Sequence, residues 1–124
     1  IWCPRPGLHE YADGSLAVRP YDAGDLHGGV RAIEIGVICP DEMALVLPLD
    51  AGVLAIADSF IRYGDDIGFV PDYLMGDNPE DIKRRTKARF LEVCDEVAFD
   101  HLLFAHGAPL IGSGRAALRA FCTN

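Results

Sequence analysis

Three apolar stretches separated by short turns constrain the fold more than any other part of the sequence. The first, from Ala32 to Val37, alternates large aliphatic residues with small or charged ones, as in a strand with one buried face. The second runs from Met43 to Leu49, after a turn at Pro40-Asp41-Glu42, and the third runs from Val53 to Ala57. Asp50-Ala51-Gly52 is typical of a hairpin connection, with Gly where a positive φ is needed. The pattern predicts a meander of three antiparallel strands.

The remaining sequence predicts a loop-rich start and two helices. Pro and Gly residues interrupt the first 28 residues, and residues 59–78 are expected to form a long loop over the strand ends. A helix should begin near Pro79 with Asn78 as its N-cap. Its expected buried stripe is Ile82, Phe90, Leu91, Val93, Cys94 and Val97. A second helix is expected from about Arg115 to Cys122, capped by Ser113 or Gly114.

The composition is that of one packed domain covering residues 1–124. Half of the residues are hydrophobic and 24% are charged, which is ordinary for a folded protein. No apolar run approaches the roughly 20 residues needed to span a bilayer, and the first residues lack the pattern of a secretory signal. We therefore expect a cytoplasmic protein with no membrane partner.

The charge of the chain argues against a nucleic-acid partner. The formal net charge is -8, which would repel a phosphate backbone. The dense basic stretch Lys83–Arg89 is followed by Glu92, Asp95 and Glu96, a pattern typical of the solvated face of a helix. An anion or partner site is the alternative for that stretch.

The four cysteines predict no zinc knuckle and no redox motif. Cys3, Cys39, Cys94 and Cys122 are widely spaced and form no CxxC pair. With this much aliphatic core and no secretory signal, we expect reduced and mostly buried thiols.

Two apolar stretches end on residue types that bind metal ions. The stretch Val53–Ala57 is followed by Asp58, and Leu102–Ala105 is followed by His106. Buried strands in α/β proteins place the residues just past their carboxyl ends in a shared crevice. A carboxylate and an imidazole delivered in this way can converge on one ion, so Asp58 and His106 are the candidate metal ligands.

Both candidates also have a structural interpretation. Asp58 is a residue type that often caps the following backbone amides, here those of Ser59 and Phe60. His106 is equally compatible with a core histidine whose partner is Asp58 or a backbone carbonyl. His101, five residues earlier, is interpreted as structural.

Several segments follow one another in an order known from an enzyme superfamily. They are Gly28-Gly29-Val30, Pro40–Leu47, Val53–Asp58, the helix after Asn78, and Leu103–Gly107 followed by Arg115–Leu118. In this order they resemble the C-terminal half of small hydrolases of the metallo-β-lactamase superfamily. The resemblance implies an α/β (α+β) fold, one half of a metallo-β-lactamase-type αββα sandwich with a mixed or antiparallel sheet and helices on one face. Such a half leaves an apolar sheet face uncovered, so we expect it to pair with itself or with a partner.

The resemblance also implies metal-dependent hydrolysis. In the family, a carboxylate after one core strand bridges two metal ions, and a late histidine, often followed by Gly, ligates one of them. Asp58 and His106 stand at these positions. The implied metal is zinc, iron or manganese. The implied chemistry is attack by a metal-bound hydroxide on an ester, thioester, amide or phosphoester of a small-molecule substrate.

Two departures from the family pattern leave the ligand set incomplete. No HxHxDH motif is present, and Cys39-Pro40-Asp41-Glu42 stands where relatives have Pro-Gly-His. Cys39 could offer a thiolate, but a buried structural cysteine is the preferred interpretation, and Glu42 is expected to stay in solvent at the turn. Because position 1 is Ile, we expect a chain that is truncated, processed or one part of a larger polypeptide whose first half holds the motif. A degenerate family member is the alternative.

Two functions from different classes therefore stand. The first is a metal-dependent hydrolase, or the C-terminal half of one, completed by ligands from elsewhere. The second is a non-catalytic binding or assembly module without a cofactor, whose partner is a second copy or an upstream half-domain. Stoichiometric bound metal would discriminate between them.

Overall fold

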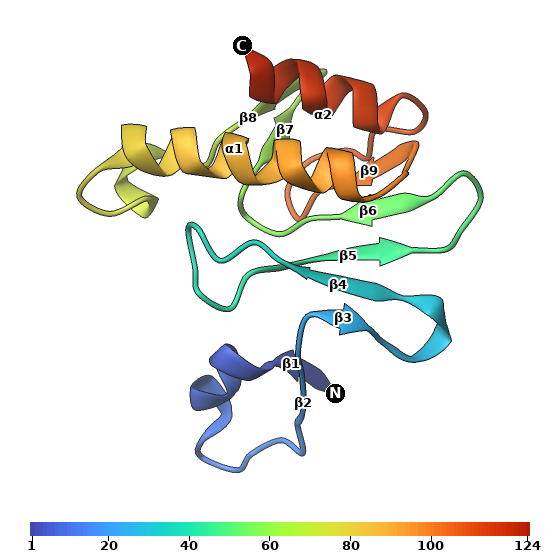
Figure 1. Cartoon of the computed structure of the whole chain (residues 1–124). Coiled ribbons are helices and arrows are strands. Elements are labelled where there is room, and N and C mark those ends of the chain that lie inside the picture. The colour runs from blue at the N-terminus through green and yellow to red at the C-terminus, as the bar shows by residue number, and fades with distance from the viewer.

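A computed structural model describes residues 1–124 and centres on a five-stranded sheet (Figure 1). Its strands, in spatial order, are β3 (Gly24–Asp25), β4 (Arg31–Glu34), β5 (Met43–Leu47), β6 (Val53–Ala55) and β9 (His101–Leu103). The pairs from β3 to β6 are antiparallel, and β9 is parallel to β6. The predicted meander is confirmed, and of the two expected sheet types the mixed one is present.

Turn chemistry sets the ends of the meander strands. β5 ends at Leu47, directly before Pro48, which has no amide hydrogen for a ladder hydrogen bond. Gly52 has a φ of 89°, and its amide donates to Leu49 O at 2.9 Å. A Cβ at Gly52 would lie 2.8 Å from Ala98 O, so this turn needs glycine for space as well as for conformation.

Two helices cover one face of this sheet (Figure 1). The first, α1, spans Pro79–Glu96 and begins as predicted, because the Asn78 side chain accepts a hydrogen bond from Asp81 N at 3.2 Å. The second, α2, spans Gly114–Thr123. Ser113 holds its N-cap position at a φ of 58° but makes no capping hydrogen bond with its side chain. Instead, the Ser113 amide donates to Asp100 Oδ1 at 2.7 Å.

The main core lies between the helices and the sheet. Its buried members are Ile33, Ile35, Ala44, Leu54, Ile56, Phe60, Phe90, Val93, Cys94, Val97, Phe99, Leu102, Leu118 and Cys122. The expected stripe of α1 is confirmed at Phe90, Val93, Cys94 and the C-cap residue Val97, whereas Ile82 and Leu91 are only partly buried. Thr86 is fully buried within that stripe because its hydroxyl donates to Ile82 O at 2.8 Å.

The other face of the sheet has no helix over it. Strand register places Ala32, Leu45, Ala55 and Leu103 in one row on that face. Ala32 is buried, but Leu45, Ala55 and Leu103 are only partly buried. This arrangement is the mixed α/β fold expected from the sequence, with helices on one face, and it is consistent with half of a metallo-β-lactamase-type αββα sandwich.

The N-terminal segment forms a small unit of its own at the β3 side of the sheet (Figure 1). Strands β1 (Trp2–Pro4) and β2 (Arg19–Tyr21) pair in parallel. A 3-10 helix, Arg5–Tyr11, directly follows β1 in the chain. A Cβ at Gly7 would lie 3.0 Å from the Asp41 carboxylate, so this unit packs closely on the turn before β5.

The long loop predicted for residues 59–78 is wrong in part. It contains the hairpin of β7 (Ile61–Tyr63) and β8 (Asp66–Gly68) and a 3-10 helix, Asp72–Leu74. The hairpin forms because Ile61, Val70 and Met75 build a small second core that the Gly and Asp residues of the segment do not reveal. None of the helices in the structure is both long and apolar enough to cross a membrane.

Candidate functional site

The Asp58 carboxylate and the His106 imidazole lie side by side at one end of the central strands. β6 and β9 are parallel neighbours, and the two residues follow the carboxyl ends of these strands. Asp58 Oδ1 and His106 Nε2 are 3.2 Å apart, and the side chains are 60% and 68% exposed. The structure thus brings together the two residues that the sequence singles out, and solvent reaches both of them.

Arg62 of β7 holds the loop that carries His106. Its amide donates to His106 O at 2.9 Å, and its Nη1 donates to Pro109 O at 2.6 Å. Gly107 has a φ of 103°, and a Cβ there would lie 2.2 Å from Arg62 O. The chain therefore approaches β7 so closely after His106 that only glycine fits. The sequence around Arg62 does not predict this role, because the loop that Arg62 holds is more than forty residues away in the chain.

Glu42 holds the strand end next to Asp58. It is only 7% exposed, and its Oε1 accepts hydrogen bonds from Ser59 N at 2.9 Å and from Ser59 Oγ at 2.6 Å. The expectation that Glu42 stays in solvent is wrong, because the turn before β5 folds its side chain under the residues after β6. The interpretation that Asp58 caps the Ser59 amide is also wrong, because this amide donates its hydrogen bond to Glu42 instead.

Burial dominates the electrostatics of Glu42. Loss of solvent raises the pKa of its carboxyl group, and the nearby Asp58 and Asp41 carboxylates raise it further. The two hydrogen bonds from Ser59 oppose this rise because they stabilise the ionised form. Glu42 Oε2 is buried without a hydrogen-bond partner.

Cys39 lies at the same end of the sheet, and its predicted burial is wrong. It is exposed, because the turn that contains it projects beyond β4 instead of entering the core. It lines a cavity of about 270 Å³ together with Asp41, Glu42 and Asp58. Partial burial and the surrounding carboxylates raise the pKa of its thiol, so this environment disfavours the thiolate that a metal ligand needs.

The distance within the Asp58–His106 pair fits two corners of a tetrahedral metal site. Two ligand atoms that lie about 2.0–2.1 Å from one zinc ion at the tetrahedral angle are about 3.3 Å apart. Catalytic zinc sites usually take three protein ligands. No group of three or more His, Cys, Asp or Glu side chains in the structure is arranged to hold a metal ion. The chain thus offers two ligands of suitable spacing and does not form a complete site.

A second Asp–His pair lies at the opposite end of the same strands. The amide of Gly112 donates to His101 Nδ1 at 3.0 Å, so Nε2 carries the ring proton and donates to Asp50 Oδ2 at 2.9 Å. Both ring nitrogens of His101 are occupied within the chain. This arrangement agrees with the structural interpretation of His101 and distinguishes it from His106.

Comparison with solved structures finds the same fold in part of a larger protein. Rubredoxin oxygen:oxidoreductase from the anaerobe Desulfovibrio gigas aligns with a TM-score of 0.60 and 16% sequence identity, over 99% of this chain and 37% of that chain. This chain therefore spans little more than a third of the length of that protein. No protein-family model matches the sequence, and no curated protein matches it either. At this level of identity the likeness shows a shared fold and nothing about activity.

Proposed function

We propose that this chain belongs to the metallo-β-lactamase superfamily and forms the part of a metal-dependent hydrolase that contributes Asp58 and His106 to the metal centre. The observation that carries this proposal is the 3.2 Å separation of Asp58 Oδ1 and His106 Nε2 at the carboxyl ends of β6 and β9. Both side chains are solvent-exposed, so a metal ion can reach the two ligand atoms from solution.

The remaining ligands would come from residues outside these 124, because the described residues form no larger ligand group. When bound, zinc, iron or manganese would lower the pKa of water and polarise an ester, thioester, amide or phosphoester bond of a small-molecule substrate. The chain itself holds the backbone that carries the imidazole through the Arg62 clamp on the His106 loop, and it fixes the strand end at Asp58 through Glu42 and Ser59. These contacts position two ligands before any metal arrives.

A partner that covers the helix-free face would complete the sandwich. The N-terminal segment approaches this face near the strand ends that carry Asp58, where Tyr21 and Met43 line the same cavity as Cys39 and Asp58. Leu47, Ala55 and Leu103 remain partly exposed further along the sheet. We expect either a second copy of this chain or the complementary half-domain to pack there.

The incomplete ligand set favours one alternative, a non-catalytic binding or assembly module. The observation that supports this alternative is that only two potential ligands, and no group of three, come together in the structure. In that case Asp58 and His106 are an exposed pair of polar side chains 3.2 Å apart, with no metal between them.

Calorimetric titration of the chain with Zn²⁺, and separately with Mn²⁺, tests the metal proposal. We expect one weak site per chain that is lost in Asp58→Asn and in His106→Ala. The matched control is Asp50→Asn, which alters the other Asp–His pair and should leave metal binding unchanged. Absence of binding at millimolar metal, or equal loss in the control, would contradict the metal role and favour the binding module.

A further inference from the structure

A second cavity lies away from the Asp58–His106 pair, between the N-terminal segment and the helix-free face of the sheet. Its volume is about 560 Å³, within the range of roughly 300–1,000 Å³ typical of small-molecule sites. Its lining residues are Trp2, Tyr21, Asp25, Leu26, His27, Val30 and Leu45. They come from β1, β2, β3, the turn before β4, and β5, so the cavity exists only in the folded chain.

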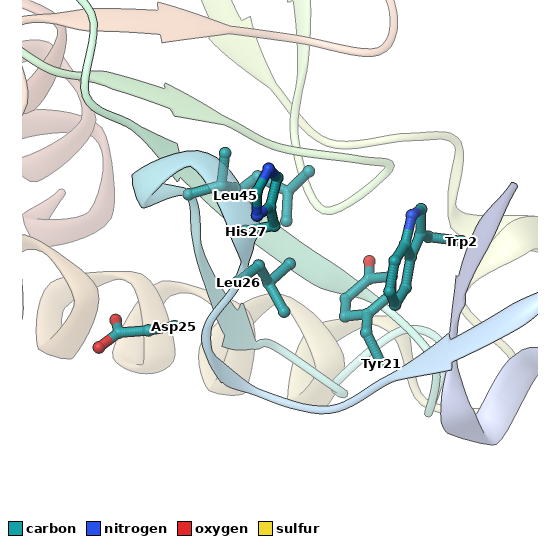
Figure 2. Close-up of a pocket in the computed structure, with 7 residues that line it drawn as sticks. Trp2, Tyr21, Asp25, Leu26, His27 and Leu45 are labelled. Carbon is teal, nitrogen blue, oxygen red and sulfur yellow. The ribbon is translucent and has the colours of Figure 1, made fainter.

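The walls of the cavity are two aromatic rings and an aliphatic surface. Figure 2 shows the rings of Trp2 and Tyr21 close together, facing Leu26, His27 and Leu45 across the hollow. Trp2 is 61% exposed. A large aromatic side chain that stays this exposed beside an apolar hollow has one ring face available for stacking.

The backbone fixes both walls in place. Trp2 lies opposite Arg19 in the β1–β2 register, and the Arg19 guanidinium lies 5.9 Å from the centre of the Trp2 ring. On the other wall, Gly28 and Gly29 both have a φ of 76°, which turns the chain so that His27 lies over β5. Gly29 also packs on Pro48, since a Cβ there would lie 3.2 Å from that ring. The cavity is therefore defined by ordered contacts on both sides.

The polar atoms around the cavity limit the charge of an occupant. The Trp2 indole N–H, the Tyr21 hydroxyl and the His27 ring make no hydrogen bond within the chain, so they are available to a ligand. The charged group of the lining is the Asp25 carboxylate, which Figure 2 shows pointing away from the other side chains. No Lys or Arg is among the lining residues, and the Arg19 guanidinium lies over the Trp2 ring, so a phosphate or carboxylate inside the cavity would meet no lining cation.

We propose that this cavity binds an uncharged planar aromatic molecule, which stacks on Trp2 and Tyr21 and forms a hydrogen bond with the polar atoms at the rim. Stacking on two aromatic rings favours a flat π-system over an aliphatic ligand of equal size. The unpaired indole, hydroxyl and imidazole groups favour a ligand with a hydroxyl or ring nitrogen at its edge. The proposal does not depend on the metal function of Asp58 and His106.

The experiment uses 2-naphthol as the probe and the indole N–H signal of Trp2 as the reporter. Trp2 is the single tryptophan of the chain, so its ¹H–¹⁵N resonance is unambiguous. We expect a saturable shift of this resonance with one 2-naphthol per chain by calorimetry. Two variants test the cavity: Trp2→Ala, whose binding is measured by calorimetry because it lacks the reporter, and the cavity-filling Leu45→Phe. Each should weaken 2-naphthol binding at least tenfold. The matched control is Tyr73→Ala, because Tyr73 is an aromatic residue that is 82% exposed and lines none of the cavities described here.

Several outcomes would overturn the proposal. One is the absence of a saturable shift up to millimolar 2-naphthol, and another is unchanged binding in Trp2→Ala. Equal affinity for cyclohexanol would show that the cavity takes any apolar molecule and would refute the aromatic class. Sedimentation showing a dimer that protects Trp2 and excludes the probe would assign the cavity to a second copy of the chain.

Discussion

Glu42 and Ser59 are joined by two hydrogen bonds that reach from the turn before β5 to the residues after β6. Glu42 Oε1 accepts from both the amide and the hydroxyl of Ser59, while Oε2 has no partner. Ser59 is fully buried, so the amide has no water to replace this acceptor. The pair therefore links the acidic turn to the strand end that carries Asp58.

Replacement of Glu42 tests this link. We expect Glu42→Ala to lower the free energy of unfolding by about 1–3 kcal/mol, because it leaves buried donors of Ser59 without an acceptor. Glu42→Gln keeps a carbonyl oxygen and removes the buried charge, so it should cost less than Glu42→Ala at neutral pH. Urea denaturation of the three proteins measures both differences. A larger loss for Gln than for Ala would contradict the proposed role of Oε1.

The same residue predicts a pH dependence. Because burial raises the pKa of Glu42 in the folded state, the folded chain binds this proton more tightly than the unfolded chain. Its contribution to stability is fully present below the ordinary pKa and is lost as the pH rises through the raised, folded-state pKa. The difference in unfolding free energy between wild type and Glu42→Gln should change across that range. A difference that stays constant with pH would contradict the raised pKa.

Gly107 should be intolerant of a side chain because of the close approach of Arg62. In Gly107→Ala, the alanine must adopt the positive φ of 103° that glycine has there. Its Cβ would also lie 2.2 Å from Arg62 O. Gly76→Ala is the matched control, because Gly76 has a φ of 76° with open space around it. The control should cost about 1–2 kcal/mol for conformation alone, and Gly107→Ala should cost more. Equal melting temperatures for the two variants would show that the loop moves away at no cost.

The start of α1 depends on the side chain of Asn78. Asn78→Ala removes the acceptor for the Asp81 amide and should lower the unfolding free energy by about 1 kcal/mol. Asn78→Ser retains a capping oxygen and should cost only a few tenths of that amount. Thermal unfolding followed by circular dichroism measures both variants. An equal loss for Ala and Ser would mean that the cap contributes little here.

The helix-free face should govern association of the chain. Leu103→Lys places a charge among the partly buried residues of β5, β6 and β9 and should shift any dimer towards monomer. Tyr73→Lys changes a residue that is 82% exposed elsewhere and should leave association unchanged. Sedimentation velocity over a range of concentrations compares the variants with the wild type. A wild-type chain that stays monomeric at all concentrations would exclude self-association and leave the complementary half-domain as the expected partner.

Local patterns were sufficient to predict the elements with strong periodicity or clear end signals. Alternation and turn residues predicted β4, β5 and β6, and the Asn78-Pro79 pair predicted the start of α1. The hairpin of β7 and β8 was missed because each strand has three residues and depends on packing against Val70 and Met75. β6 is equally short, but it lies within a continuous apolar run, whereas β7 and β8 mix charged, Gly and apolar residues and show no pattern that predicts a strand.

The sequence by itself determined the meander, the helix that follows it, and the placement of Asp58 and His106 after two apolar strands. These features depend on residues that are near one another in the chain. The burial of Glu42, the exposure of Cys39 and the Arg62 clamp on the His106 loop were decided only by the tertiary structure. The physical reason is that solvent access and hydrogen-bond partners at these positions come from segments distant in sequence, which local patterns do not bring together.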